Sequence, residues 1–219
     1  MPLKIDLHLH TYYSSDATSS LREIIICAKK KGLNGVAVTD HDTMKGARRA
    51  LKLASSMREF KVIPGVEVST LHGHVLALNI ISLIPKKLGL VETVEKIHEA
   101  GGIAVAAHPI VFVKSQMKQR TASVANLDGI EVINSSAFPF FLSTRLSQAL
   151  AKRLSLPQTA GSDAHHAIEI GTAYTLVRAD SDIDEIIEAI RKGAVTPFGK
   201  AISWEKRVKR SALRLKMWI

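Results

Sequence analysis

The chain has 219 residues, 46% of them hydrophobic, which suffices for one domain with a sizeable core. No apolar run is long enough to span a bilayer and no charged-then-apolar leader opens the chain, so we expect a cytoplasmic protein without membrane contact. A single cysteine excludes a disulfide framework, and the formal net charge of +10 indicates affinity for nucleic acid, phosphorylated metabolites or acidic partners.

The first predicted element is a strand, IDLHLHT, at residues 5–11. Apolar and polar residues alternate along it, so His8 and His10 leave the same face. Two neighbouring imidazoles make half of a metal site, although this stretch alone is more typical of an edge strand with two solvated histidines. Later apolar runs also end in His or Asp, namely TDHD at 39–42, AAHP at 106–109 and GSDAH at 161–165. This repetition favours a pocket at which several strand ends converge.

The remaining chain alternates between predicted helices and strands. Ser19 and Ser20 precede an apolar pattern of helical spacing with a closing glycine, which predicts a helix over 21–33. Further helices are predicted at residues 43–56, 90–100, 141–154 and 182–192. Strands are predicted at residues 35–39, 61–69, 74–81, 102–109, 128–134, 157–161 and 172–177, with a basic loop or short helix at 111–127. The alternation favours a (β/α) barrel, whose sites form at the carboxyl ends of the strands.

The connection after Glu67 predicts one antiparallel pair in this barrel. Only STLHG separates Glu67 from the apolar run HVLALNII, whereas a parallel crossover needs about a dozen residues. We therefore expect the next strand to run antiparallel, with His74 beside Glu67 at the pocket. His72 is the competing candidate for this position.

The polar residues at the predicted strand ends form a set of nitrogen and oxygen ligands without a thiolate. Such a set favours two or three divalent ions of zinc, manganese or iron over a structural zinc site, and its carboxylates allow bridging between ions. Asp6, Asp40 and Asp42 flank these residues, and we expect them to orient imidazoles. The candidate ligands are His8, His10, Asp16, His41, Glu67, His74, His108, Asp163 and His165.

The motifs IDLHLHT, VTDHDT, PGVEVS, AAHP and GSDAH follow one another as in the PHP superfamily, the polymerase and histidinol phosphatase metal-dependent phosphoesterases. The chain resembles this family over nearly its whole length. The resemblance implies the PHP fold, a distorted seven-stranded (β/α) TIM-like barrel, over residues 1–203, with a basic tail at 204–219 packed on or extending from it. It implies three ion sites: His8, His10, Glu67 and Asp163; Glu67, His74 and His108; and Asp16, His41 and His165.

The resemblance also implies an activity, the hydrolysis of a phosphate ester by a metal-activated water without a protein nucleophile. The expected substrate is a small phosphomonoester or a nucleotide. The expected catalytic residues are His8, His10, Glu67, Asp163 and His165. Arg145, Lys114, Lys118 and Arg120 are candidates for binding phosphate, each lysine being at least as consistent with solvated surface. Asn134 closes a strand, where it either contacts substrate or forms a turn.

The sequence leaves two alternatives to a hydrolase of small phosphate esters. One is an exonuclease or nucleoside bisphosphate phosphatase that acts on a nucleotide or single-stranded nucleic acid, and the other is a non-catalytic RNA-binding barrel similar to a ribonuclease P protein subunit. Residues 200–216 carry seven basic residues against one acid, which is more typical of a solvated helix than of a nucleic-acid arm. Trp204, Val208 and Leu213 indicate that this tail also contacts an apolar surface. The filled ligand set argues against a pure scaffold.

Overall fold

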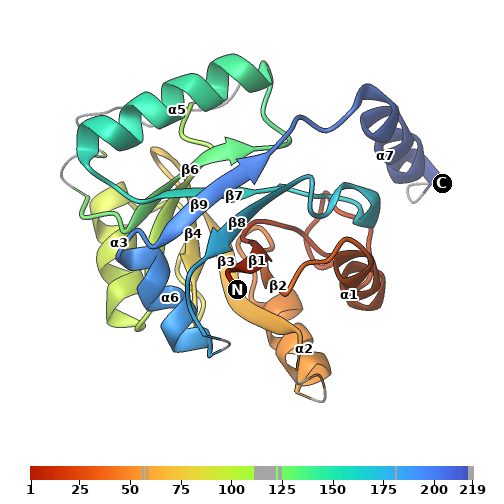
Figure 1. Ribbon diagram of the computed structural model, residues 1–219, viewed down its shortest axis with the longest axis horizontal. Coiled ribbons are helices and arrows are strands. Elements are labelled where there is room, and N and C mark those ends of the chain that lie inside the picture. Colours follow the sequence, from red (N-terminus) through yellow and green to blue (C-terminus); the bar gives the residue numbers. More distant parts are fainter. Residues whose placement is uncertain (56, 58, 111–121, 123–124, 181, 217–219) are drawn as a thin grey trace.

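The computed structural model describes residues 1–55, 57, 59–110, 122, 125–180 and 182–216 (Figure 1). Within these residues, nine strands form one sheet in the order β7-β6-β5-β4-β3-β2-β1-β8-β9. The strands are β1 Leu3–Asp6, β2 Gly35–Val38, β3 Lys61–Thr70, β4 Gly73–Leu78, β5 Ile103–Ala107, β6 Gly129–Asn134, β7 Gln158–Gly161, β8 Ala173–Val177 and β9 Val195–Gly199.

The predicted helices are present with similar bounds. They are α1 Leu21–Lys30, α2 Lys45–Ala54, α3 Leu90–Glu99, α5 Phe140–Leu154, α6 Ile183–Arg191 and α7 Trp204–Lys216, with a short 3-10 helix, η1, at Ala167–Glu169. The helix α1 begins as its sequence predicts, because the Ser20 side chain accepts from the Glu23 N–H and the Glu23 side chain accepts from the Ser20 N–H. No helix in the described part of the chain has the length and apolar content needed to cross a bilayer.

The sheet curls into a nearly closed barrel. Its edge strands β7 and β9 contact each other, and the buried Thr175 hydroxyl of β8 joins Ala160 of β7, accepting from its N–H at 2.8 Å and donating to its carbonyl at 2.9 Å. The strand β4 runs antiparallel to β3, with Ser69 opposite His74, as the short connection predicts. Two apolar clusters fill the fold: one includes side chains from α1, α2, α3 and α5, and the other packs α6 against the sheet.

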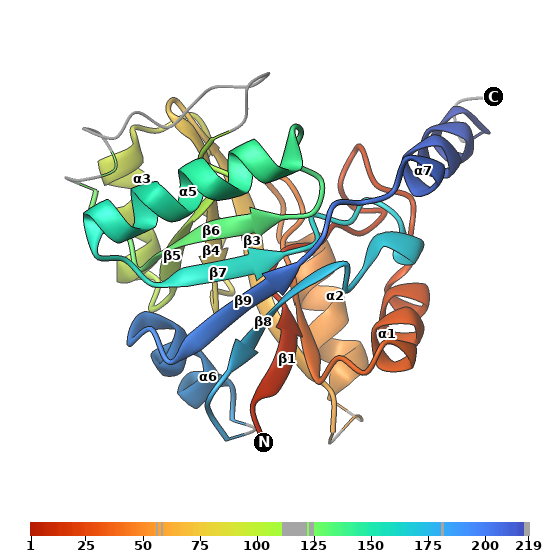
Figure 2. The same cartoon turned by 45° about the horizontal axis from the view of Figure 1, so that its top comes forward.

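The strand count differs from the seven strands that the family resemblance implies. The sequence analysis missed β9, which pairs antiparallel with β8 and carries Pro197 at its centre. A proline and a largely exposed face obscure the alternation by which strands are recognised, and both are typical of an edge strand. After β9 the chain continues into α7, which lies beyond the strands on the side to which β9 points in both views (Figure 2).

Candidate metal centre

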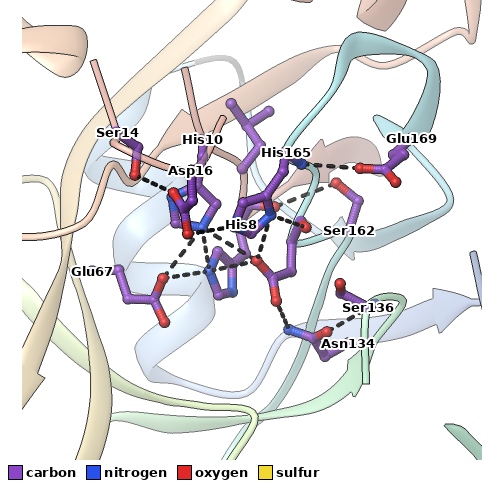
Figure 3. A network of polar contacts seen from close by, with 12 residues as sticks. His8, His10, Ser14, Asp16, Glu67, Asn134, Ser136, Ser162, His165 and Glu169 are labelled. Carbon is purple, nitrogen blue, oxygen red and sulfur yellow. Dashed lines mark hydrogen bonds and ion pairs between the residues drawn. The ribbon is translucent and has the colours of Figure 1, made fainter. Parts of the chain in front are cut away.

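Glu67 lies at the centre of the candidate site. It comes from the middle of β3, and its side chain is fully buried. The imidazoles around it come from four different segments of the chain. Figure 3 shows two of them, those of His8 and His10, beside Glu67. Five ring nitrogens lie within 3.2 Å of its oxygens: Nε2 of His8 at 3.1 Å, Nε2 of His10 at 3.2 Å and Nδ1 of His41 at 3.2 Å from Oε2, and Nδ1 of His74 at 2.7 Å and Nε2 of His108 at 3.0 Å from Oε1.

This crowding fits bound cations better than hydrogen bonds alone. A carboxylate offers about four lone-pair sites, fewer than the five imidazole nitrogens that face Glu67. In addition, the Nε2 atoms of His8 and His10 lie only 3.2 Å apart. If both rings are neutral, at most one of these nitrogens can donate to the other, whereas cations between the groups would accept lone pairs from all of them. The donor set therefore fits divalent metal ions.

A second cluster adjoins the first through His41. Its Nε2 lies 3.4 Å from Asp16 Oδ2, and His165 Nε2 lies 3.1 Å from the same oxygen. Ser14 donates to the other oxygen of Asp16 at 2.7 Å and so fixes the carboxylate. Asp163 Oδ1 connects this cluster to the first, at 3.2 Å from His10 Nε2. All nine predicted ligands thus meet in one place, and His74 rather than His72 is the neighbour of Glu67.

The groups that could each hold one ion differ in part from the expected partition. Asp16, His41 and His165 belong together, as expected, but His10 joins them. His74 groups with His41 and Glu67, and it shares Oε1 of Glu67 with His108. The four groups whose ligand atoms lie within 4.8 Å of one another are His10, Asp16, His41 and His165; His8, His108 and Asp163; His8, His10 and Glu67; and His41, Glu67 and His74.

The backbone at two candidate ligands is strained. Asp163 has a φ of 50° and His108 a φ of 29°, in a region that residues other than glycine rarely adopt. Next to them, Gly161 approaches His8 so closely that an added Cβ would lie 2.4 Å from the His8 Cβ. The strained backbone of Asp163 and His108 and the close approach of Gly161 to His8 bring the side chains at these strand ends close together.

A buried carboxylate that the sequence analysis missed, Glu131 of β6, supports these ligands. Its Oε1 accepts from His8 Nδ1 at 2.9 Å, and its Oε2 accepts from the His108 N–H and from Asn134 Nδ2, both at 2.9 Å. This contact fixes the His8 tautomer with Nδ1 protonated and leaves Nε2 free to act as a ligand. The sequence feature that could have identified Glu131 is an acidic residue inside the otherwise apolar run GIEVIN.

The aspartates expected to orient imidazoles have another role. Asp6 accepts from the N–H groups of Ser162 and Gly171, and Asp40 accepts from the N–H and hydroxyl of Thr11. Asp42 accepts from the Ser69 N–H. These partners are backbone N–H groups and a hydroxyl, so the prediction that the three aspartates orient imidazoles is wrong. The aspartates instead hold the backbone of segments close to the candidate ligands.

The electrostatics of the site follow from burying many ionisable groups together. Burial alone would lower the pKa of His10, but the hydrogen bonds and charges of Asp163 and Glu67 outweigh it and raise this pKa to about 9. Burial opposes ionisation of Glu67 and Asp163, yet the surrounding histidines hold the pKa of both carboxyls below the ordinary value. Burial raises the pKa of Asp6 to about 6, against the hydrogen bonds from Ser162, Gly171 and His8. In the metal-free state the cluster thus holds protons that cations would displace.

The candidate ligands open into a cavity of about 330 Å³, which Asn134 also lines. Arg145 is exposed on α5 and is not among the residues that line this cavity, so its role in binding substrate stays a prediction. Lys114, Lys118 and Arg120 lie outside the described residues. Arg210 and Ser211 of α7, which the sequence analysis did not single out, form part of the wall.

Comparisons with known proteins agree with this fold. Residues 142–195 match a family model described as PHP-associated. MJ1587, an uncharacterized protein of Methanocaldococcus jannaschii, is 39% identical over 144 residues, which are 60% of this chain and 82% of that protein. A 5′-3′ exoribonuclease of Haemophilus influenzae is 32% identical over 109 residues, 48% of this chain and 39% of that protein. The crystal structure of a presumed metal-dependent phosphoesterase from Bifidobacterium adolescentis matches with a TM-score of 0.65 at 19% identity, covering 94% of this chain and 100% of that one. Residues 142–195 thus match the PHP-associated family, and the barrel has the fold of the compared structure.

Proposed function

We propose that this protein is a metal-dependent phosphoesterase that hydrolyses a small phosphomonoester or nucleotide. The observation that carries the proposal is the convergence of five imidazole nitrogens on the buried Glu67 carboxylate at the edge of a cavity. Divalent ions held there would lower the pKa of a water and neutralise the charge of the phosphoryl oxygens. The nine candidate ligands His8, His10, Asp16, His41, Glu67, His74, His108, Asp163 and His165 would hold two or three such ions.

The chain's own polar groups at the cavity suit a phosphate ester. Asn134 Nδ2 lies 3.3 Å from Asp163 Oδ2, so its amide is positioned beside the candidate ligands, where it can donate to a substrate oxygen. Arg210 brings a guanidinium to the same wall, and such a group binds phosphate oxygens through paired N–H donors. Ser136 and Ala137 line the cavity next to Asn134 and add little bulk.

The test is phosphate release from a panel that contains small phosphomonoesters, a nucleoside bisphosphate and a short single-stranded oligonucleotide, each with added manganese. The double variant His10→Ala, Asp163→Ala should lose turnover while its circular dichroism spectrum stays that of a folded barrel. A matched control is His98→Ala, which removes a histidine paired with a carboxylate, Asp128, at 2.7 Å outside the cavity. Turnover retained in the double variant would refute the mechanism.

A second candidate function is an exonuclease or nucleoside bisphosphate phosphatase. The match to a protein named a 5′-3′ exoribonuclease favours it, as does the position of the basic helix α7 at the cavity wall. Oligonucleotide cleavage in the same panel would select this function. A protein that binds RNA but releases no phosphate with manganese would instead be a non-catalytic RNA-binding barrel.

A further inference from the structure

We infer that α7 and the turn after β6 form a binding surface for single-stranded nucleic acid, which leads from the metal cavity along the helix. The inference rests on the second candidate function, because it assigns the surface to a single-stranded substrate of that site. Figures 1 and 2 both show α7 beyond the barrel, on the side to which β6 and β9 point. The helix therefore adds a wall at the mouth of the cavity.

Arg210 ties this helix to the metal centre. Its Nη1 lies 3.2 Å from Oε1 and 3.4 Å from Oε2 of Glu169, a fully buried carboxylate. Glu169 Oε2 also accepts from the N–H of His165, a candidate ligand. Both contacts with Glu169 use Nη1, and a guanidinium has five N–H donors, so others can face a phosphate in the cavity that Arg210 lines.

Arg207 fixes the start of the helix to the turn after β6. Its Nη2 donates to the carbonyls of Ser135 at 3.3 Å and Ser136 at 3.2 Å, and its Nε donates to the carbonyl of Ile202 at 3.2 Å. Because Ser136 also lines the cavity, this anchor places the first turn of α7 at the cavity rim. The helix is thereby a fixed part of the site.

An exposed aromatic pair lies at this junction. The rings of Phe138 and Trp204 meet edge to face at 5.9 Å, and the Arg207 guanidinium lies 5.9 Å from the Trp204 ring. Yet Phe138 remains 56% exposed and Trp204 70% exposed, and Val208, one helical turn further, is 66% exposed. Bases of a single strand stack on exposed aromatic faces of this kind, whereas paired bases in a duplex are already stacked on each other.

The positive charge along α7 favours binding of a nucleic-acid strand over binding of a single nucleotide. The helix carries six basic residues and one acid in 13 residues, and it is about 20 Å long at 1.5 Å per residue. Trp204 and Arg210 are separated by about 9 Å along the axis. A phosphate at Arg210 and a base on Trp204 therefore belong to one end of a chain, and Lys206 and Lys209 of the same helix add positive charge near that end.

The test measures fluorescence anisotropy of manganese-loaded protein with a labelled 12-nucleotide phosphorothioate single strand, with a duplex of the same sequence, and with unlabelled adenosine monophosphate as competitor. Trp204→Ala should weaken single-strand binding about 5- to 150-fold, the range for loss of one base stack. The matched control is Phe198→Ala, since Phe198 is also an exposed aromatic, stacked on Tyr174 at 5.8 Å with Lys4 over that ring at 5.7 Å, but on β9. This control should bind like the wild type.

The double variant Lys206→Ala, Lys209→Ala should reduce the slope of log affinity against log salt by about 1.4, at about 0.7 per phosphate contact of a single strand. Equal affinities of Trp204→Ala and Phe198→Ala, equal binding of duplex and single strand, or an equal effect of Trp204→Ala on adenosine monophosphate would each overturn the inference. Strand binding without any phosphate release would refute the proposed function alone, and monoester turnover without strand binding would refute the surface alone.

Discussion

Glu131→Gln tests whether the buried carboxylate of β6 supports the metal centre. Glutamine keeps the shape and can still accept from His8 Nδ1 with its one oxygen. Its amide nitrogen would then replace Oε2, which accepts from the His108 N–H and from Asn134 Nδ2 at 2.9 Å each. The amide NH₂ group would then face the N–H of His108 and the side-chain amide of Asn134, which are also donors. Each unpaired buried donor costs about 1–3 kcal/mol.

We expect the metal affinity of Glu131→Gln to fall about 10- to 100-fold, because this carboxylate orients one candidate ligand ring and the backbone of another. That range corresponds to about 1.4–2.7 kcal/mol of binding free energy. Manganese titration against a fluorescent chelator measures it. The control is Asp128→Asn, because Asp128 likewise accepts from a histidine ring, His98, and from a backbone N–H, that of Ala104, both at 2.7 Å, but away from the site. Equal metal affinities for the two variants would refute the reasoning.

Three further predictions concern backbone approach, barrel closure and protonation. Gly161→Ala would place a Cβ 2.4 Å from His8 Cβ and 2.7 Å from Glu131 Oε1, so elemental analysis should find fewer ions than in the wild type; an unchanged content would show that the strand ends can separate. Thr175→Val leaves the buried Ala160 N–H without its 2.8 Å acceptor, so urea unfolding should report a loss of about 1–3 kcal/mol, and a loss below 0.5 kcal/mol, roughly the low end for one hydrogen bond, would argue against barrel closure through this residue. Because the pKa of His10 is raised to about 9, its imidazole is charged at pH 7 and must lose a proton to bind metal. Apparent metal affinity should therefore rise as the pH approaches 9, and calorimetry in buffers of different ionisation enthalpy should detect proton release at pH 7; its absence would contradict this protonation state.

Most candidate ligands were predictable because they stand in short motifs at or near the end of an apolar run, whereas Asp16 lies in the loop that follows His10. The position of His74 was inferred from the short connection after Glu67. The same short connection correctly predicted the antiparallel pairing of β3 and β4. The expected partition of ligands among ions came from the family resemblance and stays a prediction; His74 and His108 both contact Oε1 of Glu67, as that partition expects.

The supporting residues could not be assigned from local pattern, because their partners are distant in the sequence. Glu131 meets His8 across 123 positions, and Glu169 meets Arg210 across 41. Arg210 looked like one cation among many in a solvated tail, and only the three-dimensional path of α7 brings it to the cavity. Arg145, by contrast, is exposed on α5, and its expected role stays a prediction.

The most direct test of the account is the number of manganese ions that the purified chain retains after loading and gel filtration, measured by elemental analysis together with phosphate release from a phosphomonoester. The convergence of imidazoles on Glu67 predicts two or three ions per chain and turnover that disappears when a chelator removes them. A chain that retains no ion, or whose turnover persists after chelation, would contradict it.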